Sequence, residues 1–223
     1  MKNQAEKSQK ILDLLKTVAY LRSPEGCPWD QKQTNESLKK YLVEETYEVL
    51  AEIDNNSVDG LKEELGDLLF QICLHAQIQE EKGNFDISDI AEKLNKKMIS
   101  RHPHVFEKDY ESKKINNSEQ VVDQWEKIKA AEKSPNTSPF ESIPAHLPAL
   151  MRGLKILKKA DKLNLKLNEN KFNNSDLTAE EELADSLVKI ILKAKELNLD
   201  PEEVLRQRIA KIQEQFENQL IGE

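Results

Sequence analysis

Residues 42–50 read LVEETYEVL and residues 61–69 read LKEELGDLL, and these two stretches decide the fold that we expect. Each places acidic residues within a run of leucine and valine. On a helix, residues three apart share a face, so acids at this spacing form pairs. Two such pairs occur, Glu45 with Glu48 and Glu64 with Asp67. The pattern predicts two amphipathic helices, each with a carboxylate pair beside its apolar side.

The segment between these helices is short and turn-forming. Residues 54–57 read DNNS, and a connection of this length favours antiparallel neighbouring helices. In that arrangement both acidic pairs face one seam and offer four carboxylates. Such hard oxygen donors suit Mg2+ or Mn2+, which bind through a few carboxylates together with substrate phosphates. Glu44 lies about 100° around its helix from Glu45, so we expect it to orient a water or a ligand.

Acidic pairs of this kind also occur without a metal, or with a different one. The chain has 41 acidic residues, and acids three apart on a helix commonly lie on a solvated face. Di-iron oxidases also use bundle carboxylates, but they supply Glu-x-x-His pairs. The residues three before the four histidines are Ile72, Ile99, Arg101 and Ile143, so that pattern does not occur. Gly66, inside the second helix, indicates a close approach of the facing helix.

Helical periodicity extends over most of the chain and predicts an all-α protein. Aromatic residues are 5% and charged residues 33% of the sequence, which favours solvated helices over a β-rich fold. We expect a loop at 23–28, a turn around Pro103, and helices at about 11–21, 36–53, 61–81, 121–128, 150–160, 179–197 and 201–220, with another from a cap at Asp86 or Ser88 to Pro103.

Prolines divide this helical pattern into parts. We expect a helical domain at 1–132, a proline-rich linker at 133–148 and a second helical domain at 149–223. The run ELGDLL at 64–69 aligns with ELADSL at 182–187, so the second domain resembles an eroded copy of the first.

The second copy lacks several features of the first. Its upstream segment has no counterpart of EETYE at 44–48, Ile209 stands where the first copy has Asn95, and Gln215 stands where the first has Arg101. We therefore expect catalysis in the first copy, and packing, dimerisation or regulation in the second.

The composition disfavours several classes of function. A formal net charge of −8 disfavours nonspecific nucleic-acid binding, which requires a basic surface. No run of 18 apolar residues occurs and the N-terminal segment lacks a signal-peptide core, so we expect no membrane span and a cytoplasmic protein. Cys27 and Cys73 form neither a Cys-x-x-Cys pair nor a disulfide framework, which fits a reducing compartment.

The acidic motifs belong to a longer set that occurs in a fixed order. Its members are GCPWD at 26–30, EETYE at 44–48, ELGD at 64–67, RHPHVF at 101–106, WE at 125–126 and LPALMR at 147–152. Together they resemble the MazG nucleoside triphosphate pyrophosphohydrolase family over about the first two thirds of the chain. The combination is far more specific than any single acidic motif.

The resemblance implies an all-α, dUTPase-like helical-bundle fold with two related copies, the second degenerate. It implies Mg2+-dependent hydrolysis of nucleoside triphosphates, with Mn2+ as a possible substitute, to a nucleoside monophosphate and pyrophosphate. It also implies a homo-oligomer, for which we expect a dimer. The implied metal ligands are Glu45, Glu48, Glu64 and Asp67, which with Glu44 form the catalytic set. The implied substrate contacts are Lys97, Arg101, Trp125, Trp29, Asp30 and Asn95.

These motifs support two functions from different classes. The first is an enzyme that controls the nucleotide pool by removing noncanonical or excess triphosphates. The second is a helical interaction or regulatory module that keeps the fold without catalysis. Simpler roles also exist for the implied contacts: Lys97 and Arg101 fit an ordinary solvated basic edge, and Trp125 fits a core aromatic.

Overall fold

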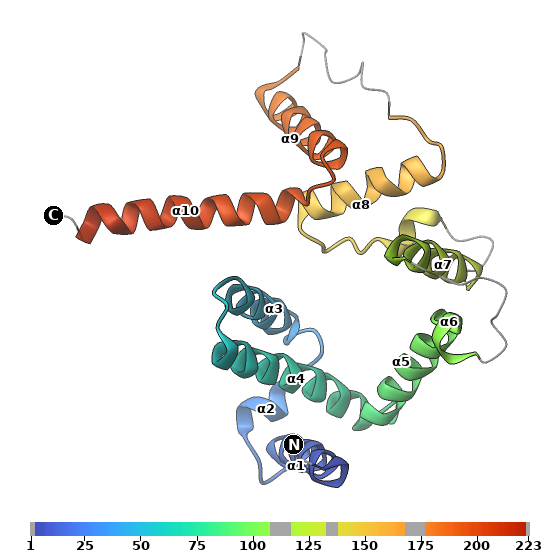
Figure 1. Ribbon diagram of the computed structural model, residues 1–223. Coiled ribbons are helices and arrows are strands. Elements are labelled where there is room, and N and C mark those ends of the chain that lie inside the picture. The colour runs from blue at the N-terminus through green and yellow to red at the C-terminus, as the bar shows by residue number, and fades with distance from the viewer. Residues whose placement is uncertain (1–2, 108–116, 133–137, 168–176, 222–223) are drawn as a thin grey trace. The chain divides into compact units, whose positions relative to one another are not determined.

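The computed structural model describes residues 3–107, 117–132, 138–167 and 177–221, and the regular structure in these ranges is helical (Figure 1). The all-α prediction is confirmed. The chain forms two compact units, Met1–Ala131 and Glu132–Glu223. The first unit contains α1 (Gln4–Arg22), α2 (Pro28–Lys32), α3 (Lys39–Asp54), α4 (Val58–Glu80), α5 (Ile87–Arg101), α6 (Pro103–Phe106) and α7 (Ser118–Ala131). The second contains η1 (Pro139–Ser142), α8 (Ala149–Lys162), α9 (Ala179–Glu196) and α10 (Pro201–Ile221).

Helix α4 is the centre of the first unit. It packs against α3 along one face and against α1 on another (Figure 1). Apolar side chains are buried between these helices, and their removal from water stabilises the core. Its buried members are Val18, Leu38, Cys73, Leu74 and Ile78. This core fixes α3 against α4, the two helices that carry the acidic motifs.

The connection of residues 55–57 sets the antiparallel course of α3 and α4. Asn56 has a φ of 53°, a left-handed conformation that asparagine tolerates better than most residues. The Ser57 hydroxyl then accepts a hydrogen bond from the Gly60 amide at 3.1 Å and caps α4. The chain therefore reverses in a few residues and returns along α3.

Two short helices, α2 and α6, were not predicted from the sequence. Helix α2 follows directly on the predicted loop, and α6 occupies the predicted turn at Pro103. Each begins with a proline, whose missing N–H would be unpaired at that position in any case. Helices this short produce no apolar periodicity, so the pattern cannot reveal them.

The boundaries of the longer helices depend on local capping. Helix α3 begins at Lys39 rather than near residue 36, because Thr34 and Ser37 exchange hydrogen bonds of 2.9 and 3.1 Å in a turn before it. For α5, Asp86 is the cap, and it forms a reciprocal capping box with Asp89.

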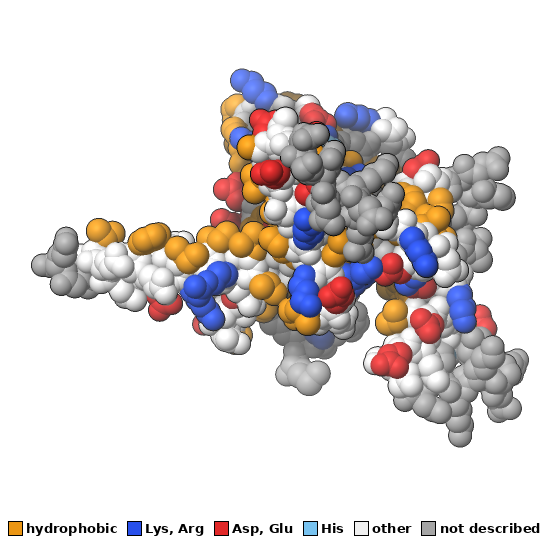
Figure 2. Space-filling view, turned by 90° about the horizontal axis from the view of Figure 1, so that it is seen from above, with side chains coloured by type: hydrophobic (Ala, Val, Ile, Leu, Met, Phe, Trp, Pro, Cys, Tyr) orange, Lys and Arg blue, Asp and Glu red, His pale blue; other side chains and the backbone are white. Residues whose placement is uncertain are grey.

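The second unit is built around α8, which packs against both α9 and α10. Leu154, Ile191 and Ala194 are buried there. Much apolar surface stays exposed, and Figure 2 shows a row of apolar side chains along α10. Leu205, Ile209, Phe216 and Leu220 are exposed members of that helix. Among the described helices, none has the length and hydrophobicity that crossing a membrane requires.

Candidate active site

Three carboxylates converge at the seam between α3 and α4. Glu45 and Glu48 come from α3 and Glu64 comes from α4, and one carboxylate oxygen of each lies within 4.8 Å of the others. The i, i+3 spacing aligns the two acids of α3, and the antiparallel packing brings α4 opposite them. In the part of the chain that the structure describes, this is the one group of three or more potential ligands at such distances.

The acids of this cluster disfavour one another's ionised forms. Partial burial raises the pKa of Glu45, and a hydrogen bond with Glu48 and the charges of Glu48 and Asp67 raise it further. The pKa of Glu64 is raised by partial burial and then by the charges of Glu48, Asp67, Glu63 and Glu52. The charged groups among these causes are all acidic, so the cluster concentrates negative potential.

These residues fit a hard divalent cation. They present several oxygen donors and no sulfur or imidazole, which is the donor set that Mg2+ and Mn2+ prefer. A cation would also relieve the repulsion that raises the pKa of Glu45 and Glu64. The arrangement can therefore hold a metal and, through it, the phosphates of a substrate.

The remaining predicted acids lie close to this cluster without joining it. Asp67 is exposed one turn after Glu64, and its charge acts on both Glu45 and Glu64. Glu44 is exposed on α3. The expected close approach at Gly66 is wrong: a Cβ built there meets nothing within 4 Å. Gly66 is exposed on α4.

Trp29 and Asp30 lie on α2, which leads toward the start of α3. Trp29 is 48% exposed, and its ring makes an edge contact with Tyr41 of α3, with ring centroids 5.7 Å apart. Tyr41 precedes Glu45 by one helical turn. Asp30 is buried, and its backbone carbonyl accepts a hydrogen bond from the Arg22 guanidinium.

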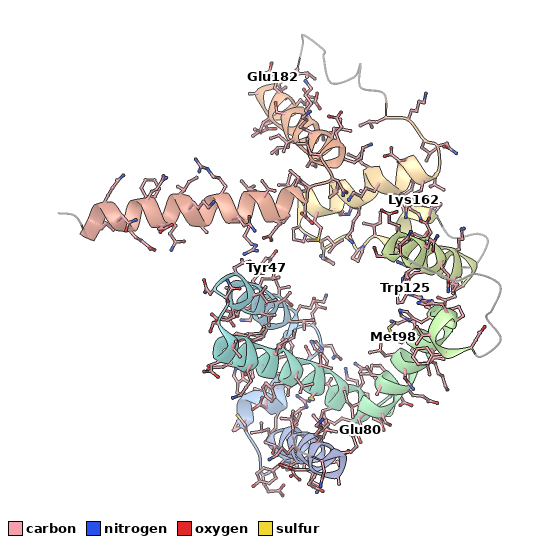
Figure 3. The ribbon with its side chains drawn as sticks, in the orientation of Figure 1. Tyr47, Glu80, Met98, Trp125, Lys162 and Glu182 are labelled. Carbon is pink, nitrogen blue, oxygen red and sulfur yellow. The ribbon has the colours of Figure 1, made fainter. Side chains whose placement is uncertain are left out.

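The predicted basic contacts form a separate group on α5 and α7. Asn95 and Lys97 are exposed on α5. Trp125 lies on α7 (Figure 3). The Arg101 guanidinium lies over its ring, 5.1 Å from the centroid, and the His102 ring meets it edge-on. Helix α5 contacts α7, whereas the main contacts of α3 are with α4 (Figure 1). Within one chain, the structure thus joins Arg101 to Trp125 and leaves both apart from the acids.

One residue at the site escapes the sequence analysis. Gln71 of α4 is 5% exposed, and its Nε2 donates to Glu45 Oε1 at 3.5 Å, which lowers the pKa of that carboxyl. The available signal was a set of polar residues at 71, 75 and 79, which a spacing of four places on one face of the helix. Such a column on a buried face requires partners, which a search for charged motifs overlooks.

The described residues form an all-α fold, and two of its helices bring the acids together. The MazG nucleotide pyrophosphohydrolase domain matches residues 33–106. The chain is 40% identical over 219 residues to the Thermotoga maritima protein named nucleoside triphosphate pyrophosphohydrolase/pyrophosphatase MazG, covering 92% of this chain and 83% of that protein. The chain therefore belongs to the MazG family.

Further relatives match about two thirds of the chain or slightly more. The Escherichia coli K12 nucleoside triphosphate pyrophosphohydrolase is 45% identical over 149 residues, which are 66% of this chain and 55% of that protein. The Mycobacterium tuberculosis protein of the same name is 36% identical over 163 residues, 72% of this chain and 48% of that protein. The chain thus spans about half the length of these two relatives. A crystal structure of a MazG-related protein from Thermotoga maritima matches 53% of this chain and 97% of that chain, with 29% identity and a TM-score of 0.44.

Proposed function

We propose that the chain hydrolyses nucleoside triphosphates to a nucleoside monophosphate and pyrophosphate in a reaction that depends on Mg2+. The observation that carries this proposal is the convergence of Glu45, Glu48 and Glu64 in a member of the MazG family. The names of the relatives support triphosphates as substrates. Control of the nucleotide pool is the cellular role that we propose for this reaction.

In this proposal the acids of α3 and α4 hold the metal. Glu45, Glu48 and Glu64 are the converging ligands, and Asp67 adds a carboxylate at the edge. Bound Mg2+ would supply a Lewis acid that neutralises phosphate charge. The cluster alone would repel the triphosphate, so the metal would have to be in place before the substrate binds.

We also propose roles for the other predicted contacts. Trp29 is exposed and contacts Tyr41, which lies one helical turn before Glu45. An exposed aromatic ring in this place suits stacking on a nucleobase. Glu44 remains the proposed residue for orienting a water, and Asp30, Asn95, Lys97, Arg101 and Trp125 remain proposed substrate contacts.

A homodimer is part of the same proposal. Apolar side chains are exposed on the helices that carry the acids, including Val43 and Tyr47 of α3 and Leu65 of α4. A second copy would cover such a surface, as interfaces between permanent partners do. Sedimentation of the purified chain should give a dimer mass, and a monomer at micromolar concentration would contradict this part.

The decisive experiment identifies the products from a panel of nucleoside triphosphates with Mg2+. We expect pyrophosphate and the monophosphate in equal amounts, and no turnover after chelation of the metal. Release of orthophosphate and a diphosphate would overturn the bond assignment. If neither metal binding nor hydrolysis occurs, the non-catalytic helical module becomes the better description.

A further inference from the structure

A column of polar side chains runs along α4 beneath the acidic cluster. Gln71, His75 and Gln79 are spaced by four residues, so they stack on one face of the helix. Buried polar groups cost free energy unless they form hydrogen bonds. The donor and acceptor of each hydrogen bond in this column therefore indicate which side chain it orients.

At the end of the column farthest from Glu45, each hydrogen bond is donated toward His75. Asn84 Nδ2 donates to Gln79 Oε1 at 2.8 Å, and Gln79 Nε2 donates to Asn35 Oδ1. Asn35 Nδ2 then meets His75 Nδ1 at 2.7 Å. Because an amide nitrogen can only donate, His75 Nδ1 must accept, and the neutral ring carries its proton on Nε2. Burial lowers the pKa of His75, which favours this neutral form.

At the end of the column nearest the acids, the hydrogen bond is likewise donated toward Glu45. Gln71 Nε2 donates to Glu45 Oε1, since an ionised carboxylate can only accept. This fixes the carboxamide so that its oxygen points away from Glu45. Gln71 Oε1 and His75 Nε2 are both buried, and neither has a hydrogen-bond partner among the described residues. The two unpaired atoms are an acceptor and a donor, one helical turn apart.

We propose that this column is a positioning relay, in which His75 Nε2–H donates through one buried water to Gln71 Oε1 and thereby holds Gln71 Nε2 against the Glu45 carboxylate. A water that joins these two atoms satisfies both of the unpaired groups. The relay then runs unbroken from Asn84 to Glu45, with every donor directed toward the carboxylate.

The relay rests on the proposed metal site, because its purpose is to orient one ligand of that site. Gln71 touches neither substrate nor reacting atoms, so it is a positioning residue. Partners behind metal ligands fix the orientation of those ligands, and their loss typically weakens metal binding by about 10–100-fold. Without Gln71, the Glu45 carboxylate would rotate away from the shared centre.

The test measures Mn2+ binding to the full chain by electron paramagnetic resonance, without nucleotide. Gln71→Met keeps the length of the side chain and removes its hydrogen bonds, and we expect Mn2+ affinity to fall about tenfold or more. Gln77→Met is the matched control, since Gln77 lies on the same helix and lines a separate cavity of about 310 Å³ against α1. The control should bind Mn2+ as the parent chain does.

A second variant tests the coupling. His75→Phe should weaken Mn2+ binding less than Gln71→Met, and the double variant should bind no more weakly than Gln71→Met alone. Nitrogen-15 shifts of the His75 ring should show the proton on Nε2. Thermal unfolding of each apo variant separates a misfolded chain from a misplaced ligand.

The possible failures are distinguishable. If the parent chain itself binds no Mn2+, the proposed metal site is wrong. If the parent binds and Gln71→Met binds equally well, or if Gln77→Met loses as much, the relay alone is overturned. Additive losses in the double variant, or a proton on Nδ1 of His75, would also overturn it.

Discussion

Helices α4 and α9 carry the same acidic motif in different surroundings. Glu64 of α4 faces two carboxylates from α3. Glu182, in contrast, lies in the first turn of α9 (Figure 3) and is exposed. The main neighbour of α9 is α8, whose sequence ALMRGLKILKKADK is rich in lysine and has one acid. That acid, Asp161, forms an ion pair with Lys195 of α9 at 2.8 Å. The facing helix, rather than the motif, therefore decides whether the acids converge.

The two helices also differ in burial. Helix α4 buries five residues between its neighbours, namely Gln71, Cys73, Leu74, Ala76 and Ile78, whereas α9 buries Ile191 and Ala194. A site with strong charge repulsion needs a rigid support, because the fold must hold together groups that repel each other. The first unit supplies that support and the second does not.

The largest effect should separate the two motifs by activity. Glu64→Gln should lower triphosphate hydrolysis by about a thousandfold, or about 4 kcal/mol in the barrier, because it removes a converging ligand. The aligned change Glu182→Gln should leave the rate within about twofold, because that side chain has no facing acids. Steady-state kinetics with saturating Mg2+ measures both. Equal losses would show that the second copy also catalyses.

The next effect concerns the cores. Leu74 is fully buried, so Leu74→Ala should lower the free energy of unfolding by about 2–5 kcal/mol. Leu183 of α9 is 64% exposed, and Leu183→Ala should cost less than about 0.5 kcal/mol. Urea denaturation followed by circular dichroism gives both values. A comparable loss at Leu183 would mean that a partner covers that surface.

A smaller difference is expected between two long-range ion pairs. The buried Arg22 guanidinium donates to both Glu81 oxygens at 2.8 and 2.7 Å and to the backbone carbonyl of Gln33 at 3.3 Å. Arg22→Ala should cost about 2–3 kcal/mol, because buried acceptors lose a charged donor. Lys195→Ala should cost at most about 1 kcal/mol, since the Lys195–Asp161 pair is more exposed. Urea denaturation of both variants measures the difference, and equal costs would contradict it.

The Arg22 pair should also depend on acidity. The pKa of Glu81 is lowered first by its hydrogen bond with Arg22. The native state therefore binds fewer protons than the unfolded chain, and this stabilisation is present above a pH of about 4.5 and is lost as pH falls through the lowered pKa. Thermal melts of the parent chain and Arg22→Ala should converge in acid. If they stay parallel, the ion pair contributes nothing.

The smallest expected effect is the pH dependence of stability that Glu45 and Glu64 cause, and its sign is opposite to that of Glu81. The pKa values of Glu45 and Glu64 are raised above 4.5, so the native state binds more protons and stability falls as pH rises through these values. Without metal, Glu45→Gln should raise the melting temperature at neutral pH and change it little below about pH 4. Added Mg2+ should stabilise the parent chain and leave this variant unaffected. Glu182→Gln is the control, with no expected change.

Part of this molecule was predictable because the relevant information is local. The expected helices have counterparts in the structure, and Asp86 caps α5, since apolar periodicity and capping depend on residues a few positions apart. The spacing of Glu45 with Glu48 likewise determined a carboxylate pair on α3. Short helices such as α2 were missed because one turn leaves no periodic signal.

Tertiary packing decided the rest. The sequence placed four acids on two helices, yet the rotation of α4 against α3 decided that Glu64 converges with Glu45 and Glu48 while Asp67 lies beside them. The same rotation turned Gly66 outward and brought Gln71 to Glu45. Spacing along a helix fixes which side chains share a face, but the face that meets a neighbour depends on burial of the whole core. That is why the sequence determined the donors of this site, and the tertiary structure determined which of them meet.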